Sequence, residues 1–173
     1  QVYCMAITSN EKIVRGRPTS WSAAIDQLAF GEEIQTDEEN ILVKRLIILS
    51  AGNIRNTDEY INYPDSNLTI SVEDPSQSWK ALTVGAITNK VLITDPAYAG
   101  HTPLAEYGQL SPYSSTSLTW ERKWPLKPEI VLEGGNILKA PDDSIVGTTD
   151  DLAILSTSSR PVNNQFDAFH GTS

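Results

Sequence analysis

The apolar residues of the chain are grouped into short, nearly continuous runs that are separated by polar segments. Such runs predict buried strands near 2–8, 46–51, 81–87 and 128–132. A weaker run over 153–157 predicts a fifth strand. Each run is too short for a core helix and is rich in β-branched and aliphatic residues, which are typical of strands.

Between the first two predicted strands, the spacing of apolar residues changes to that of a helix. Trp21, Ile25 and Leu28 recur at helical spacing, and Gly31 follows as a stop signal. We therefore expect a helix over 20–30 that packs on one face of the sheet through these three side chains. A strand, a helix and a strand in this order form a right-handed βαβ unit, so the predicted class is α/β with a mainly parallel sheet.

The remaining segments are polar. Residues 60–75 are rich in Asn, Asp, Ser and Pro and are predicted to be a surface loop with short extended pieces. Residues 96–124 carry many tyrosines and serines and are predicted to be irregular. The acidic run at 36–39 is interpreted as the solvated N-terminus of a helix. Because the sequence has no internal repeat and no low-complexity tract, residues 1–173 are expected to form one domain.

The composition excludes several classes of partner. The net charge of −9 argues against nucleic acid, since phosphate binding requires clustered Lys and Arg. No apolar run approaches the roughly 20 residues that cross a bilayer, so no membrane partner is expected. Cys4 is the only cysteine, which excludes an internal disulfide and is compatible with a reducing compartment. The two histidines lie far from it in sequence, so we expect no metal site and no cofactor.

Four short motifs, taken together and in order, carry the candidate chemistry. They are Ser50-Ala51-Gly52-Asn53, Thr83-Val84-Gly85-Ala86, Lys127-Pro128-Glu129-Ile130-Val131 and Gly171-Thr172-Ser173. This ordered set resembles the subtilisin-like serine peptidases (subtilases), in which S-A-G-N or A-A-G-N, V-G-A, K-P-D and G-T-S follow one another. The resemblance spans nearly the whole chain and implies a subtilisin-like three-layer fold. Residues 133–136 replace the usual Ala-Pro-Gly, a departure that favours a divergent, intracellular bacterial branch.

The resemblance implies catalytic roles for two residues, Ser173 and Asn53. Ser173 would be the nucleophile, at the start of a central helix. Peptide hydrolysis develops a negative oxygen on the scissile carbonyl, and preorganised donors must stabilise it. The Asn53 amide and the Ser173 backbone N–H would be these donors, and Gly171 would permit the close backbone approach. Taken alone, Asn53 is as well explained as a turn residue; beside Gly-Thr-Ser, the oxyanion role is favoured.

In this family, the general base His and its orienting Asp precede the strand that begins here at Val2. His101 and His170 follow Asn53 in the sequence. His101 is interpreted as a surface residue, and His170 as a structural neighbour of Ser173 without a catalytic role. We therefore expect a partial catalytic domain, truncated at both ends, of a serine endopeptidase, and we expect the isolated chain to be inactive. Two alternatives stay open: a non-catalytic pseudo-peptidase binding module, and an unrelated α/β ligand-binding domain.

The partner implied by the resemblance is a peptide or protein substrate, gripped by strand addition. The expected substrate-binding residues line a specificity pocket: Ala6, Ile7, Thr8, Ser50, Ala51 and Gly52. Thr8 stands where many relatives have glycine, which predicts a shallower pocket that favours small or medium side chains. The missing central helix would leave apolar surface exposed, so self-association of the truncated chain is expected.

Overall fold

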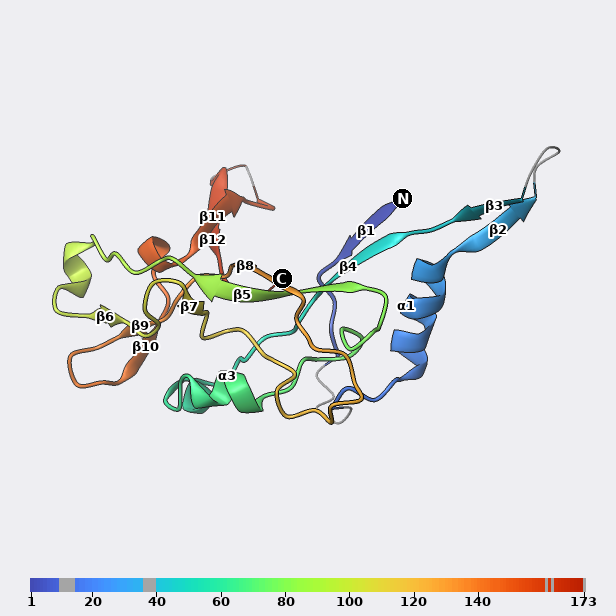
Figure 1. Ribbon diagram of the computed structural model, residues 1–173. Helices are drawn as coiled ribbons and strands as arrows, with labels where there is room; N and C mark the ends of the chain where they lie inside the picture. The colour runs from blue at the N-terminus through green and yellow to red at the C-terminus, as the bar shows by residue number, and fades with distance from the viewer. Residues whose placement is uncertain (10–14, 36–39, 161, 163, 173) are drawn as a thin grey trace.

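The computed structural model describes residues 1–9, 15–35, 40–160, 162 and 164–172 (Figure 1). Its main sheet consists of β1 (Val2–Met5), β4 (Leu46–Ser50), β5 (Leu82–Thr88), β7 (Gln109–Leu110) and β8 (Ile130–Glu133). The pairs β1–β4, β4–β5 and β5–β8 are parallel, and only the short β7 is antiparallel to β5. The predicted α/β class with a mainly parallel sheet is confirmed, although β1 is shorter than the predicted strand.

The predicted helix is confirmed as α1 (Ser20–Phe30), which packs on one face of the sheet at β4 (Figure 1). Thr19 caps its N-terminus, because Thr19 Oγ1 accepts a hydrogen bond from the Ser22 backbone N–H at 3.0 Å. Ser22 Oγ in turn accepts from the Thr19 N–H at 2.9 Å, which completes a capping box. The helix ends at Gly31, whose φ of 96° suits glycine alone.

The face through which α1 packs differs from the predicted one. Trp21 and Leu28 are exposed, at 37% and 48%, and the buried residues of the helix are Ser22, Ile25 and Ala29. Trp21 and Leu28 each precede a buried residue, so they are rotated by about 100° from the buried stripe. The helix is anchored on β4 by a buried apolar cluster: Ile25, Ala29, Ile47, Leu49 and Ala81.

The other strands form three small antiparallel sheets. They are β2 (Glu32–Gln35) with β3 (Asn40–Val43), β6 (Thr102–Pro103) with β9 (Leu138–Lys139) and β10 (Ile145–Gly147), and β11 (Ile154–Thr157) with β12 (Phe166–Phe169). The predicted fifth strand thus exists as β11, but it pairs with β12 outside the main sheet. The β2–β3 hairpin was not predicted, and the acidic run at 36–39 lies outside the described residues.

The segment 60–75 is not a surface loop throughout. α2 (Thr57–Tyr60) ends where this segment begins, and α3 (Asp65–Thr69) lies within it. Two short 3₁₀ helices lie elsewhere in the chain, at Pro96–Tyr98 and Asp150–Leu152. Buried Asn67 donates from Nδ2 to the carbonyls of Ser111 (2.9 Å) and Ser114 (2.7 Å). These bonds connect α3 to the segment that contains Ser111 and Ser114. Both segments lie at the carboxyl ends of the strands, beside the candidate site.

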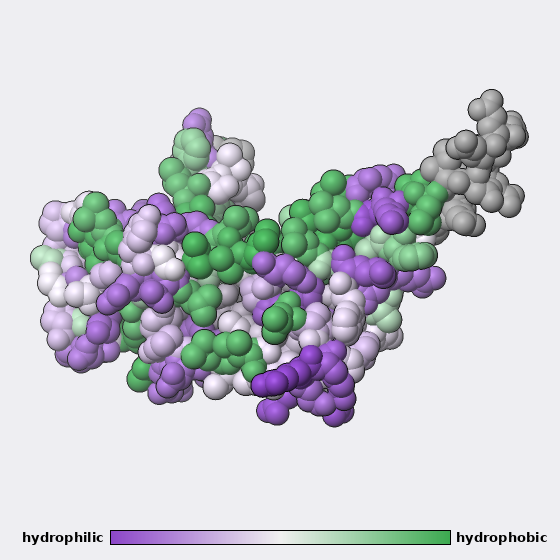
Figure 2. All heavy atoms as spheres, in the orientation of Figure 1, coloured by the Kyte–Doolittle hydropathy of each residue, from purple (hydrophilic) through white to green (hydrophobic). Residues whose placement is uncertain are grey.

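The sheet face opposite α1 is apolar and largely uncovered in the described part of the chain. The register places the side chains of Val2, Leu46, Ile130 and Leu132 on this face, and all four are exposed. Figure 2 shows apolar surface gathered over β1 and around β8. In the described residues, no helix has both the length and the apolar character needed to cross a membrane.

Candidate active site

The first element of the site is the turn at the end of β4. Gly52 adopts a φ of 91°, a left-handed conformation that favours glycine, and it redirects the chain after Ser50. Asn53 follows and forms an isolated antiparallel bridge with Ser114. The turn therefore presents the Asn53 side chain at the carboxyl edge of the parallel sheet, where open α/β sheets bind their ligands.

The last described residue, Thr172, is bound directly to this turn. Its backbone N–H donates to Asn53 Oδ1 at 2.7 Å, across 119 positions of sequence. Its hydroxyl lies 2.9 Å from the Gly52 carbonyl and 3.0 Å from Asn53 Oδ1, and it also pairs with Ser50 Oγ at 2.9 Å. The Gly-Thr-Ser motif and the Ser-Ala-Gly-Asn motif are thus brought together, as the sequence predicted, as far as Thr172. Ser173, the predicted nucleophile, lies outside the described residues.

Two glycines allow this close approach. Gly171 has a φ of 109°, and a Cβ on it would lie 2.8 Å from Oδ1 and 2.9 Å from Nδ2 of Asn53. Its N–H donates to the Gly134 carbonyl at 2.8 Å. A Cβ on Gly134 would lie 2.4 Å from the Cβ of Ala86. Gly134 was not predicted as a site residue; the sequence signal was the Gly-Gly pair at 134–135, which lacks any dinucleotide spacing.

The Lys-Pro-Glu motif braces the sheet beneath the site. Lys127 is buried, and its ammonium group donates to the Ala81 carbonyl at 2.9 Å and pairs with the Glu129 carboxylate. Burial lowers the pKa of Lys127, and the carboxylate of Glu129 opposes that shift. Glu129 also accepts from the Thr83 backbone N–H at 2.7 Å. The motif therefore joins the entry of β8 to β5 and has a structural role.

An aromatic stack lies beside the Asn53 turn, and the sequence did not predict it. The His170 ring packs on Tyr113 with centroids 4.6 Å apart, and Tyr113 meets Tyr60 edge-to-face at 5.8 Å. Burial lowers the pKa of His170 and raises the pKa of Tyr60 to about 12, so both are neutral at physiological pH. Tyr113 is tied to the turn because its carbonyl accepts from the Ile54 N–H at 2.9 Å.

Of the histidines, His101 is placed in another part of the fold. It packs edge-to-face on Tyr98, with centroids 5.6 Å apart, near the β6–β9–β10 sheet. Its Nδ1 atom is buried and has no hydrogen-bond partner among the residues that the structure describes. In the described part of the chain, no three His, Cys, Asp or Glu side chains are grouped as metal ligands. The hydrogen bonds that define the site join Thr172 to Asn53, and neither histidine takes part in them.

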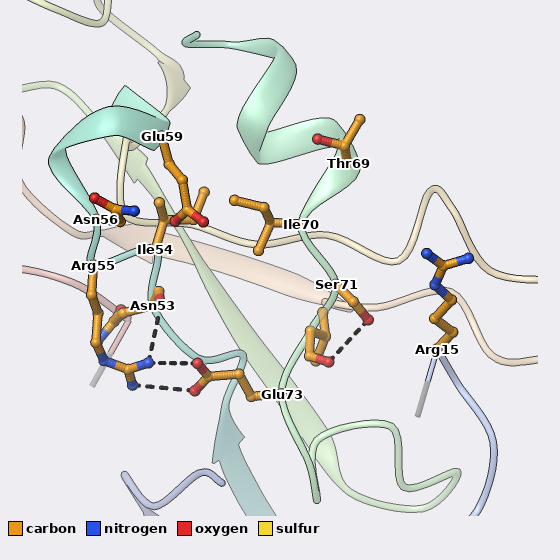
Figure 3. A pocket seen from close by; sticks show the side chains of 11 residues that line it. Arg15, Asn53, Ile54, Arg55, Asn56, Glu59, Thr69, Ile70, Ser71 and Glu73 are labelled. Carbon is orange, nitrogen blue, oxygen red and sulfur yellow. Dashed lines mark hydrogen bonds and ion pairs between the residues drawn. The ribbon is translucent and has the colours of Figure 1, made fainter. Parts of the chain in front are cut away.

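The expected substrate-binding residues lie on the two sides of the partly buried carboxylate of Glu73. Beyond β1, the Thr8 hydroxyl donates to Glu73, and the Ser9 N–H donates to the Asp74 carbonyl at 2.8 Å. On the other side, Glu73 packs against Gly52 and forms an ion pair with Arg55 (Figure 3). No local sequence signal marks Glu73, because its partner Thr8 lies 65 positions away and reaches it only in the fold.

A comparison with protein-family models agrees with this geometry. The model described as the subtilase family matches residues 1–173, the whole chain. The chain therefore belongs to the subtilase family, as its four motifs predicted, and is a subtilisin-like peptidase region; the substrates that this family implies are proteins. A comparison with curated proteins gave no match.

Proposed function

We propose that the protein containing this chain is a serine endopeptidase in which Ser173 attacks the scissile carbonyl and Asn53 stabilises the oxyanion. The observation that supports it most is the hydrogen bond from the Thr172 N–H to Asn53 Oδ1. This bond joins Thr172, the residue before the nucleophile, to the oxyanion donor. Peptide hydrolysis requires the nucleophile and the oxyanion donor to contact the same substrate carbonyl.

The same hydrogen bond orients the amide of Asn53. Because Oδ1 accepts from Thr172, the two ends of the amide are distinguished, and the Nδ2 end is the one that donates to the oxyanion. The backbone N–H of Ser173 supplies the second donor. Held in place before the reaction, such donors stabilise the developing charge without reorganisation.

The general base and its orienting carboxylate come, in this proposal, from sequence that precedes Gln1. Within the described residues, His170 is stacked on Tyr113 and His101 lies against Tyr98, and the proposal gives neither of them the role of base. The 173-residue chain alone therefore has a nucleophile and an oxyanion donor without a base, and it does not hydrolyse peptides.

Substitution of the oxyanion donor tests the proposal in the full-length protein. Asn53→Ala is expected to lower kcat about 10²–10³-fold, the loss known for this donor in subtilisin itself, with KM little changed. Asn89→Ala, an exposed asparagine just after β5, serves as the control and should retain wild-type kcat. An unchanged kcat in Asn53→Ala would remove this residue from the oxyanion hole.

The same assay separates the endopeptidase from its alternative. A full-length protein that binds peptides but cleaves none of them would be a pseudo-peptidase binding module with the same fold. In that case, the sequence before Gln1 should lack an Asp and a His in the order that the family uses. Hydrolysis that depends on Asn53 contradicts that alternative.

A further inference from the structure

We propose that Glu73 is a specificity-determining residue, which binds the cationic side chain of an arginine or lysine in the peptide substrate. In the absence of substrate, Arg55 occupies the place of that cation. The inference rests on the proposed function only in taking a peptide as the ligand.

The position of Glu73 follows from the way two parallel strands separate. β1 and β4 are paired as far as Met5 and Leu49, and beyond these residues the segments Ala6–Ser9 and Ser50–Asn53 continue without ladder pairing to each other. The carboxylate of Glu73 lies between them, since it accepts the Thr8 hydroxyl on one side and packs against Gly52 on the other. A crevice outside the carboxyl ends of parallel strands is where α/β sheets bind ligands.

The surrounding chain is shaped to hold a carboxylate at this point. A Cβ on Gly52 would lie 2.5 Å from both Cγ and Oε2 of Glu73, so glycine is needed there to make room. The Glu73 N–H donates to the Ala51 carbonyl at 3.0 Å, which fixes the backbone beside the Asn53 turn. The Glu73 side chain is only 15% exposed. A carboxylate buried to this extent requires a cationic or hydrogen-bonding partner.

Arg55 is a replaceable partner. Its Nη1 and Nη2 atoms form a fork on the carboxylate, at 2.5 Å to Oε1 and 3.2 Å to Oε2, and Nη1 also donates to the Asn53 carbonyl at 3.2 Å. The Arg55 side chain is 51% exposed, and ion pairs that water can reach contribute little to stability. A substrate guanidinium can make the same bidentate contact, so it can displace Arg55 at small cost.

The space beside this pair suits a side chain of that length. A cavity of about 410 Å³ opens between the Asn53–Asn56 turn and the segment 69–73, with the Arg55–Glu73 pair at its edge (Figure 3). Arg15 and Glu59 also line it, on its far side and above it. The net charge of −9 attracts cationic peptides over longer distances. Thr8 was expected from the sequence to limit the size of the pocket. In this proposal its hydroxyl orients the carboxylate of Glu73.

Binding of a cationic probe tests the proposal without catalysis. Titration calorimetry of the full-length protein with benzamidine, an aromatic amidinium, should detect binding that weakens at least about ten-fold in Glu73→Gln. Arg55→Ala removes the competing guanidinium and should tighten binding about two- to five-fold. Glu106→Gln, which removes an exposed carboxylate outside the cavity lining, is the matched control and should bind like wild type.

Several results would overturn the proposal. Equal binding by wild type and Glu73→Gln, no binding by either wild type or Arg55→Ala, or weaker binding by Arg55→Ala would each do so. Because Glu73→Gln can disturb folding, its circular dichroism is compared with that of wild type, and Arg55→Ala gives an independent test. Loss of binding in Glu59→Gln but not in Glu73→Gln would place the cation on another carboxylate.

Substrate profiles then separate this inference from the proposed function. Matched peptides with Arg, Leu or Ala before the scissile bond should be cleaved with the highest kcat/KM for Arg, and Glu73→Gln should lose that preference at least about ten-fold. Hydrolysis with a preference for Ala or Leu in both proteins would contradict the role of Glu73 alone. Benzamidine binding that depends on Glu73, without any hydrolysis, would contradict the peptidase proposal alone.

Discussion

At the residue level, the candidate site depends on backbone positions that only glycine fills well. Gly52 and Gly171 both have positive φ values, and each lies against a side chain of the site, Glu73 or Asn53. A larger residue at either position would push away the group that the site needs. The contact between Gly171 and Asn53 in particular determines where Thr172 meets the turn.

Gly171→Ala in the full-length protein tests this contact. The added Cβ should clash with the Asn53 amide, so we expect the free energy of unfolding to fall by about 1–3 kcal/mol, and kcat to fall with it. Urea denaturation and peptide hydrolysis measure the two effects. Gly108→Ala is the matched control, because Gly108 has a φ of 76° and nothing within 4 Å of an added Cβ. Equal losses in the two variants, with kcat unchanged, would contradict the role of Gly171.

Part of this site could be predicted from the sequence because its residues are contiguous in motifs. Asn53 and Thr172 each lie in a short motif, and the structure brings those motifs together. Glu73 and Tyr113 could not be found in this way. Each stands in an irregular polar segment, and its role arises from partners that are distant in sequence, such as Thr8 for Glu73.

At the level of elements, the parallel strands were predicted because each is a short, continuous apolar run. The register of α1 was not, because apolar residues occupy more than one of its faces, and tertiary packing selected the stripe with Ile25 and Ala29. The β2–β3 hairpin was not predicted, because β2 contains a single apolar residue and the apolar run of β3 is only three residues long. The fifth strand was predicted and exists as β11, but its length and composition do not specify its partner, β12.

The uncovered face of the main sheet leads to a prediction about association. Parallel sheets are normally covered on both faces, so the 173-residue chain should self-associate through this face. Leu132→Lys, at a position 61% exposed on β8, should shift sedimentation-velocity profiles towards monomer. Leu126→Lys, at a loop position 80% exposed, should not. A monodisperse monomer for the unchanged chain would contradict this expectation.

At the level of the whole molecule, the fold brings the oxyanion candidate and the Gly-Thr-Ser segment to one edge of the sheet, within a chain that matches the subtilase family throughout. The two histidines pack on tyrosines, His101 in another part of the fold and His170 beside the Asn53 turn. The account therefore assigns the chain part of a catalytic centre: the nucleophile and the oxyanion donors. We propose that the base comes from sequence outside these 173 residues.

The most direct test of this account is covalent labelling with a fluorophosphonate, followed by mass-spectrometric mapping of the modified residue. Such probes react with a serine only when a general base activates its hydroxyl. The account predicts that the full-length protein is labelled at Ser173, and that Ser173→Ala and the isolated 173-residue chain remain unlabelled. Labelling of the full-length protein at another serine, or labelling of the isolated chain at the full-length rate, would contradict it.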